Sequence, residues 1–277
     1  MTMNKRWGVL LIFLVHHPLT AGEGVADLMH STYKITNPGS TATCFLVKRT
    51  AGDDSQGSPV YVVTAAHVFE KMQGDFSEIV LRKKNKEGSF DRDPIRVAVR
   101  QKGRPLWFKH PQADVAVIPL SIPKGRFFSM LDFDQIVSHQ MIKKGVPSCS
   151  DEVWIPGYPA QLESTSAGFP VLRRGTVASF PLTPISKNGT FLIAAATFGG
   201  DSGAPVLVGG GGDSQPKGAA LALVGLVVGK HRETSRTVTP SEERTIHRSL
   251  GLAIVVHSHL IRETIQIAGR ESGQDGG

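Results

Sequence analysis

Short apolar segments, separated by polar segments that contain glycine and proline, recur along most of the chain. Between about residues 26 and 120 they read TCFLVK, PVYVVTAAHV, EIVLR, IRVAVR and DVAVIPL. After residue 146 the pattern starts again with EVWIPGY, VLRRGTVASF, TFLIAAA, APVLV, ALALVGLVVG and LGLAIVV. Valine- and isoleucine-rich runs of this length are typical of β-strands. Two sets of roughly six strands predict an all-β protein built from two closed barrels or sandwiches.

The remaining segments complete the predicted organisation. Residues 26–123 form the first barrel, residues 124–145 a less regular connection, and residues 146–268 the second barrel with a C-terminal helix. The helix is predicted because the apolar residues of SHLIRETIQIA recur at helical spacing. Residues 269–277 are expected to be a disordered tail.

Two polar inserts interrupt the second set of strands. The first, GGGGDSQPKG, starts at Gly209 and is predicted to be a flexible hairpin loop. The second runs from Lys230 to Ser249 and reads KHRETSRTVTPSEERTIHRS. It lacks apolar alternation and is therefore predicted to contain no strand.

The start of the chain has the order of a secretory signal peptide, which we assign to residues 1–22. Lys5 and Arg6 precede the apolar run WGVLLIFLV, and the small-residue patch LTAG follows it. Basic, apolar and small segments in this order direct export, with cleavage expected after Ala21 or Gly22. The alternative is a buried N-terminal strand. Because the run has only 9 residues, no stable membrane span is expected. The predicted location is secreted or periplasmic.

The charge and the cysteines change this picture little. The 277-residue chain has a formal net charge of +7, and a basic cluster reads LRKKNKEG from Leu81. No aromatic residues interleave with the cluster, so it is interpreted as a solvated loop and nucleic acid is not an expected partner. Cys44 and Cys149 have no metal-ligand spacing, and whether they pair is left open.

The segment TFGGDSGAPVLVGG places Ser202 among glycines. Glycines allow positive φ angles and close approach of other groups. The serine therefore either forms a tight turn or acts as a nucleophile, with neighbouring N–H groups free to bind an anion. A nucleophilic serine needs a base, and the base needs a partner that orients it.

His67 and Asp114 are the candidates for these two roles. Most of the ten histidines lie in the signal segment, the polar insert, connecting segments or beside the terminal helix. His67 instead ends the apolar strand YVVTAAHV, and Asp114 begins the strand DVAVIPL. Taken alone, His67 is interpreted as a satisfied core or surface histidine, and Asp114 as a strand-capping residue. Together with Ser202 they fit a triad, in which the Asp fixes the His tautomer and the His accepts the Ser proton.

At these residues the sequence resembles the trypsin-like, chymotrypsin-fold serine peptidases. TAAHV, DVAVIPL and GDSGAP are similar to the His, Asp and Ser motifs of that family and occur in the same order, separated by 47 and 88 residues. The bacterial secreted branch is the most similar. The resemblance implies two six-stranded antiparallel β-barrels with the active site between them, and a C-terminal helix. It also implies protein or peptide substrates and no metal or organic cofactor.

The same resemblance assigns further site residues. The N–H groups of Gly200 and Ser202 would form the oxyanion hole, and Ala196, Thr197 and Val228 would line the substrate pocket. Ala196, Thr197 and the expected wall segments LVVG and SLGLA contain no acidic residue, so cleavage is expected after small or medium apolar residues. Two alternatives are left open: the insert from Lys230 brings Glu242 or Glu243 to the rim, or His247 enters the pocket and selects acidic residues. No IVGG-like segment follows the signal peptide, so Asp201 lacks the ammonium partner of a trypsin zymogen scheme.

The predicted function is therefore a secreted serine endopeptidase. The alternative is a catalytically inactive trypsin-fold protein that acts in binding or adhesion, although all three triad residues are present. An esterase is less favoured because the GxSxG elbow of α/β-hydrolases is absent around Ser202.

Overall fold

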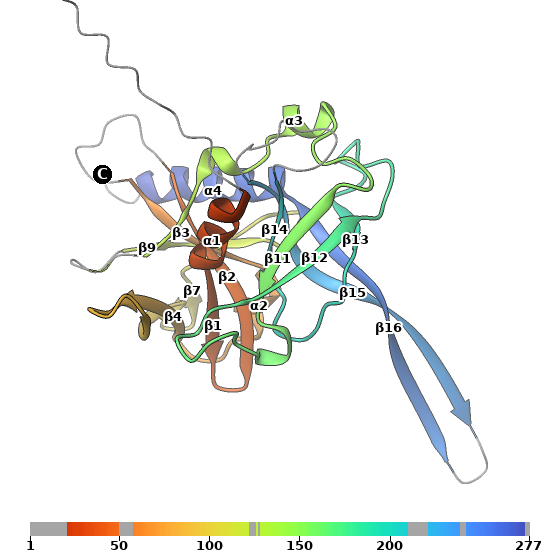
Figure 1. The fold of residues 1–277 in the computed structure, drawn as a ribbon, viewed down its shortest axis with the longest axis horizontal. Helices are drawn as coiled ribbons and strands as arrows, with labels where there is room; N and C mark the ends of the chain where they lie inside the picture. The colour runs from red at the N-terminus through yellow and green to blue at the C-terminus, as the bar shows by residue number, and fades with distance from the viewer. Residues whose placement is uncertain are drawn as a thin grey trace, which may run out of the picture.

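The computed structural model describes residues 21–49, 58–121, 126, 128–209, 221–238 and 242–274. Two β units follow one another along the chain, and a C-terminal helix packs against them (Figure 1). This arrangement confirms the predicted all-β class with a terminal helix. The signal segment through residue 20, most of the glycine-rich insert and residues 275–277 lie outside the described residues.

The first β unit is an eight-stranded sheet. Its strand order is β5-β4-β1-β2-β3-β9-β8, and β10 pairs in parallel with β2. Beside it, a separate two-stranded sheet joins β6 and β7. The strands are β1 Thr32–Asn37, β2 Ser40–Lys48, β3 Val60–Thr64, β4 Phe76–Lys84, β5 Phe90–Ala98, β6 Arg100–Gln101, β7 Arg104–Pro105, β8 Phe108–Lys109, β9 Ala116–Leu120 and β10 Leu131–Asp132.

The second β unit is a closed barrel of six antiparallel strands in the order β11-β12-β13-β16-β15-β14. Closure satisfies the backbone groups that an open sheet would leave at its edges. The strands are β11 Glu152–Gly157, β12 Val171–Val177, β13 Thr190–Ala194, β14 Pro205–Val208, β15 Ala222–Val238 and β16 Glu243–His257.

The described helices are short except at the two ends. They are α1 Ala21–Ser31, α2 Ala66–Lys71, α3 His139–Lys143 and α4 Ser258–Gln274, with 3-10 turns η2 Phe133–Gln135 and η3 Pro159–Gln161. Helix α4 returns to the first unit, because Ile261 and Ile265 are fully buried in the core cluster that contains the buried residues of β2 and β3. None of the described helices has the length and hydrophobicity needed to span a membrane.

Helix α1 was not predicted, since the first barrel was expected to begin at residue 26. Residues 26–31 are instead helical. The hydroxyl groups of Ser31 and Thr32 both donate to the carbonyl of Leu28, at 3.2 and 3.0 Å. These bonds close the last turn of the helix and fix the point where β1 begins.

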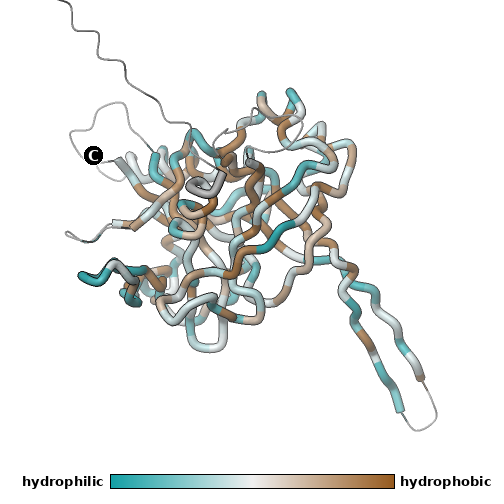
Figure 2. The backbone as a smooth tube through the Cα atoms, viewed as in Figure 1, coloured by the Kyte–Doolittle hydropathy of each residue, from teal (hydrophilic) through white to brown (hydrophobic). Residues whose placement is uncertain are grey.

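The second polar insert is strand rather than loop, contrary to the sequence interpretation. Strands β15 and β16 continue past the barrel and pair from Arg232↔Ser249 to Val238↔Glu243. This extension, residues 230–238 and 242–250, is called the arm, and it projects from the body of the molecule (Figure 1). All its described residues from 231 onward except Ile246 are exposed. Neither face is buried, so no hydrophobic alternation marks the strands, and Figure 2 shows the arm as mostly hydrophilic.

The terminal helix is also longer than predicted. It runs to Gln274, so residues 269–274 belong to the helix and not to a disordered tail. Ser272 donates to the carbonyl of Ala268 at 2.7 Å. Gly269 allows close packing, because a Cβ there would lie 2.7 Å from the guanidinium group of Arg49.

One cation of the basic cluster is buried, which corrects the interpretation of the cluster as a solvated loop. Arg82 lies in β4, is 6% exposed, and donates to the carbonyls of His30, Thr32 and Gly168 at 2.8, 2.8 and 2.9 Å. A buried cation is tolerated when hydrogen bonds replace its water. Arg82 thereby joins α1, the first unit and the loop after η3, while the lysines of the cluster are exposed.

Candidate active site

His67 and Asp114 meet because two buried strands pair. In the antiparallel register of β3 and β9, Thr64 lies opposite Ala116. The end of β3 and the start of β9 therefore share one edge of the sheet. His67 follows β3 in the first turn of α2, and Asp114 stands two residues before β9.

The Asp114 carboxylate holds His67 at two points. One oxygen accepts the His67 backbone N–H at 2.9 Å, and the other lies 2.6 Å from Nδ1 of the ring. Burial alone would raise the pKa of Asp114. Hydrogen bonds from the ring and amide of His67, with the charges of His67 and Lys109, outweigh burial and hold this pKa below its ordinary value.

Ser202 completes the constellation from the second β unit. Its Oγ lies 2.9 Å from Nε2 of His67. With Nδ1 donating to Asp114, Nε2 is left unprotonated and can accept the serine proton. The structure thus brings together the three residues predicted as catalytic; their catalytic role stays a prediction.

The loop that carries Ser202 is anchored to the first unit. The backbone N–H of Thr43 in β2 donates to the carbonyl of Ser202 at 3.0 Å, and the Thr43 hydroxyl donates to the carbonyl of Gly200 at 2.8 Å. Gly200 has φ +99°, and a Cβ there would lie 2.1 Å from the carbonyl oxygen of Tyr158. Only glycine fits this position.

The backbone N–H groups of Gly200 and Ser202 are the predicted oxyanion donors. The carbonyl of Gly199 accepts from the N–H of Ala160 at 2.7 Å. In a trans peptide the carbonyl and the following N–H point in opposite directions, so the N–H of Gly200 points away from Ala160. Within the described part of the chain, neither this N–H nor that of Ser202 has an acceptor. Both are therefore free to bind an anionic oxygen.

Asp201 is held by a residue that the sequence interpretation missed. Arg173 of β12 makes two bonds of 2.6 Å to the two carboxylate oxygens of Asp201, which is 1% exposed. The same carboxylate accepts the N–H of Phe198 at 2.7 Å. A Cβ at Gly157 would lie 2.9 Å from both charged groups, so glycine makes room for the pair. The sequence analysis found no ammonium partner for Asp201. Arg173 supplies the positive charge instead.

A cavity of about 600 Å³ opens beside Ser202 and His67. Of the predicted pocket residues, Thr197 and Val228 line it. Ala196 does not; it is exposed, and its carbonyl accepts from Arg173 at 3.0 Å. Its placement as the pocket floor is corrected accordingly, since the bond to Arg173 turns this peptide toward the ion pair. Lys230, which was not predicted as a pocket residue, lines the cavity instead.

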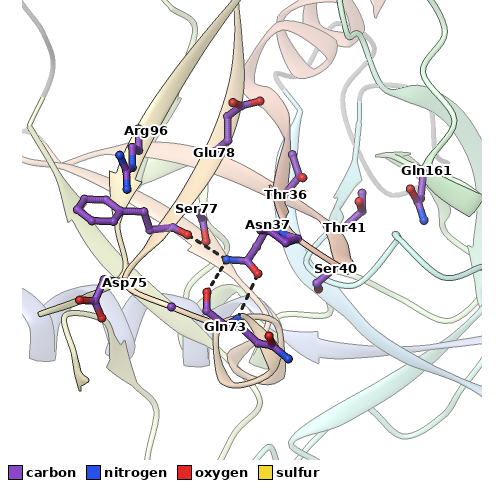
Figure 3. Close-up of a pocket in the computed structure, with 14 residues that line it drawn as sticks. Thr36, Asn37, Ser40, Thr41, Gln73, Asp75, Ser77, Glu78, Arg96 and Gln161 are labelled. Carbon is purple, nitrogen blue, oxygen red and sulfur yellow. Dashed lines mark hydrogen bonds between the residues drawn. The ribbon is translucent and has the colours of Figure 1, made fainter. Parts of the chain in front are cut away.

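A larger hollow of about 830 Å³ contains none of the triad residues. It lies between the β1–β2 turn and the start of β4, and Figure 3 shows the Asn37 side chain directed toward Gln73. Asn37 Nδ2 donates to the carbonyls of Gln73 and Phe76 at 2.6 and 2.9 Å. These bonds occupy the amide in bracing the turn. Size alone therefore does not identify the active site here.

The two cysteines are free. Cys44 is fully buried and Cys149 is exposed. Burial raises the pKa of the Cys44 thiol well above its ordinary value, which keeps it protonated.

Two β units with a serine, a histidine and an aspartate linked across them define a trypsin-like peptidase. The model of the trypsin-like peptidase domain matches residues 42–212, and the chain belongs to that family. Among curated proteins, none matches the chain.

Solved structures with similar folds share little sequence with this chain. A variant of human heparin binding protein (CAP37) is 14% identical, with a TM-score of 0.50 over 87% of this chain and 91% of that chain. An inactive serine-to-alanine mutant of Rv3671c from M. tuberculosis is 16% identical, with a TM-score of 0.49 over 94% and 98%. The inactive form of the Rv3671c protease is 17% identical, with a TM-score of 0.47 over 89% and 92%. The likeness to heparin binding protein supports the fold and nothing beyond it.

Proposed function

We propose that the protein is a serine endopeptidase that cleaves peptide bonds through an acyl-enzyme. The observation that carries the proposal is the continuous chain of contacts from Asp114 to His67 at 2.6 Å and from His67 to Ser202 at 2.9 Å. A geometry of this kind positions a nucleophile, its base and the group that orients the base.

In the proposed reaction Ser202 Oγ attacks the scissile carbonyl while Nε2 of His67 takes its proton. The imidazolium that forms is stabilised by the Asp114 carboxylate. The carbonyl oxygen becomes an anion and accepts from the N–H groups of Gly200 and Ser202. His67 returns the proton to the leaving amine, and water then hydrolyses the acyl-enzyme by the same route in reverse.

A serine-reactive fluorophosphonate probe tests the proposal directly. Wild type should be labelled at one site and should cleave unstructured protein substrates, whereas Ser202→Ala should do neither. Ser166→Ala is the matched control, because Ser166 is exposed and outside the triad; its labelling should equal that of wild type. Turnover that survives in Ser202→Ala would refute the mechanism.

The same experiment distinguishes the alternative of an inactive binding protein. Such a protein would keep the fold, yet Ser202 would resist the probe because the oxyanion loop or the cleft would not admit it. A folded protein whose Ser202 is not labelled, and that cleaves no peptide in a diverse library, would favour this alternative.

We further propose that the chain is exported and processed near residue 22. The support is the basic, apolar and small-residue order of residues 1–22. Mass spectrometry of protein recovered from the medium or periplasm should find a chain that begins at Gly22 or Glu23. An intact chain that still carries Met1 in the cytosol would contradict the proposal.

The apolar preference expected from the sequence gains no support from the cavity, because Lys230 places an ammonium group in its wall.

A further inference from the structure

The cavity beside Ser202 is positively charged. It shares Ser202 and His67 with the triad, so the side chain that precedes an attacked carbonyl would have this cavity within reach. The described residues that line it include several cations and no aspartate or glutamate. The basic side chains besides that of His67 are Lys71, Lys230, His231, Arg232 and His247.

Lys230 is the half-buried cation among them. It stands where β15 leaves the barrel, and its Nζ donates to the carbonyl of Thr197 at 3.0 Å. The same Nζ lies 5.5 Å from the centroid of the Phe198 ring. No carboxylate of the described residues lies within ion-pair distance of it. An ammonium group has three donors, so two remain for a ligand.

One residue that lines the cavity carries a hydroxyl group without a hydrogen-bond partner among the described residues. Thr197 is 3% exposed, and its Oγ1 is buried without a hydrogen-bond partner among the described residues. Buried hydroxyl groups in folded proteins nearly always have a partner. Because this oxygen is buried, an acceptor placed beside Lys230 would reach it only if the Thr197 side chain moved.

Glu233, the acidic residue of the arm nearest to Lys230 in sequence, does not line the cavity and lies opposite Arg248 in the strand pairing. Glu243 is paired with Arg236 at 2.7 Å and lies opposite Val238, at the far end of the described arm. Eight residues of strand separate Val238 from Lys230, a distance of about 26 Å. On α2, Glu70 is bonded to Lys109 at 2.6 Å. Among the described residues, the cations besides His67 that line the cavity therefore have no carboxylate within ion-pair distance.

We propose that this cavity selects aspartate or glutamate immediately before the cleaved bond, with Lys230 as the specificity-determining residue. The proposal rests on the serine-peptidase function proposed above. An apolar side chain entering the cavity would strip water from the ammonium group and give nothing in return. A carboxylate accepts from the two free donors, in a charge-assisted bond stronger than a neutral one.

Matched peptides measure the effect. Peptides that differ only in Glu, Gln, Asp, Leu or Arg before the cut should show kcat/KM for Glu about 10- to 100-fold above Gln in wild type. In Lys230→Met, which keeps the length of the side chain, Glu and Gln should fall within about threefold of each other. Lys71→Met is the control, because Lys71 lines the same cavity from α2 and is exposed; it should retain most of the preference.

A binding measurement keeps this test separate from that of the function. Product peptides that end in Glu or Gln are titrated into Ser202→Ala and into Ser202→Ala/Lys230→Met. Tighter binding of the Glu peptide that disappears with Lys230→Met supports the proposal even if no peptide is cleaved and the peptidase function fails. Equal cleavage and equal binding of Glu and Gln peptides, or a preference for Leu or Arg, would overturn the acidic specificity while leaving the peptidase function intact.

Discussion

The two β units hold their parts of the site by different means. In the first, His67 and Asp114 sit at the ends of β3 and β9, whose pairing lies inside the core; every residue of β3 is buried. In the second, Ser202 sits on a glycine-rich loop outside the barrel strands. The positions of His67 and Asp114 thus depend on packing, whereas the position of Ser202 depends on a few polar contacts. A single substitution should therefore disrupt the Ser202 loop more easily than the pair of His67 and Asp114.

The largest expected effect on kcat comes from loss of the base, His67. His67→Ala should lower kcat by about 10⁶, as loss of the base does in subtilisin, because Nε2 of His67 is the one group among the described residues that is bonded to the Ser202 hydroxyl and can take its proton. The fold should persist, since the imidazole is only partly buried. Circular dichroism and a progress curve on one peptide substrate measure both quantities. A loss below a hundredfold would show that His67 is not the base.

Asp114→Asn should have the next largest effect. The amide would place an NH₂ group where His67 now donates, either from Nδ1 or from its backbone N–H. The ring would then favour the tautomer that protonates Nε2, and kcat should fall by about 10⁴. Asp134→Asn is a surface control, since Asp134 is 95% exposed. Retention of wild-type turnover in Asp114→Asn would remove this residue from the triad.

The nucleophile loop is tested through Arg173. Arg173→Met leaves the Asp201 carboxylate buried without its counter-charge, which costs about 3–5 kcal/mol in the free energy of unfolding. The loop should rearrange, and loss of one oxyanion donor lowers kcat by about 10² to 10³. Urea unfolding and peptide turnover measure the two effects.

Arg174→Met provides the matched control for that variant. Arg174 is the next residue of β12, is 60% exposed, and pairs with Glu152 on the surface at 2.9 Å. Such pairs contribute about 0–1 kcal/mol, so stability and turnover should hardly change. If both arginine variants behaved alike, the Arg173–Asp201 pair would have no special role in supporting the loop.

Sequence patterns were informative where chemistry or burial constrains residue types. Buried strands such as β3 and β9 are nearly continuous apolar runs, and the triad residues lie in short motifs at their ends or between glycines. The structure brings these residues together as the motifs indicate. The resemblance of these motifs, in this order, to the trypsin-like family indicated that three distant segments meet.

Sequence patterns failed where neither face of an element is buried or where a partner comes from another strand. The arm lacks alternation because solvent covers both of its faces. Lys230 directly follows LVVG, which was an expected wall segment. If β15 had been predicted to continue past Gly229, Lys230 would have been expected in the pocket wall. Arg173 sits beside Arg174 in VLRRG, and the strand period turns one inward and the other outward. Which of them meets Asp201 follows only from the closure of the barrel.

The smallest expected effect is on the stability of the second β unit. At neutral pH it should leave His67 and Asp114 unchanged. His257 ends β16, is fully buried against Phe191, and has no hydrogen-bond partner for either ring nitrogen among the described residues. Burial, with a smaller effect of the charge on His259, lowers the pKa of His257 from 6.5 to about 4. Between these two values the unfolded chain binds a proton that the folded barrel does not. Stability is therefore fully present above pH 6.5 and decreases as the pH falls toward 4, by about 3 kcal/mol in total.

Urea unfolding from pH 7 to pH 4 should show this slope in wild type and in the exposed control His231→Gln. In His257→Leu, which removes the titrating group and fits an apolar site, this part of the slope should vanish; an unchanged slope would mean that other groups control the acid sensitivity of the barrel.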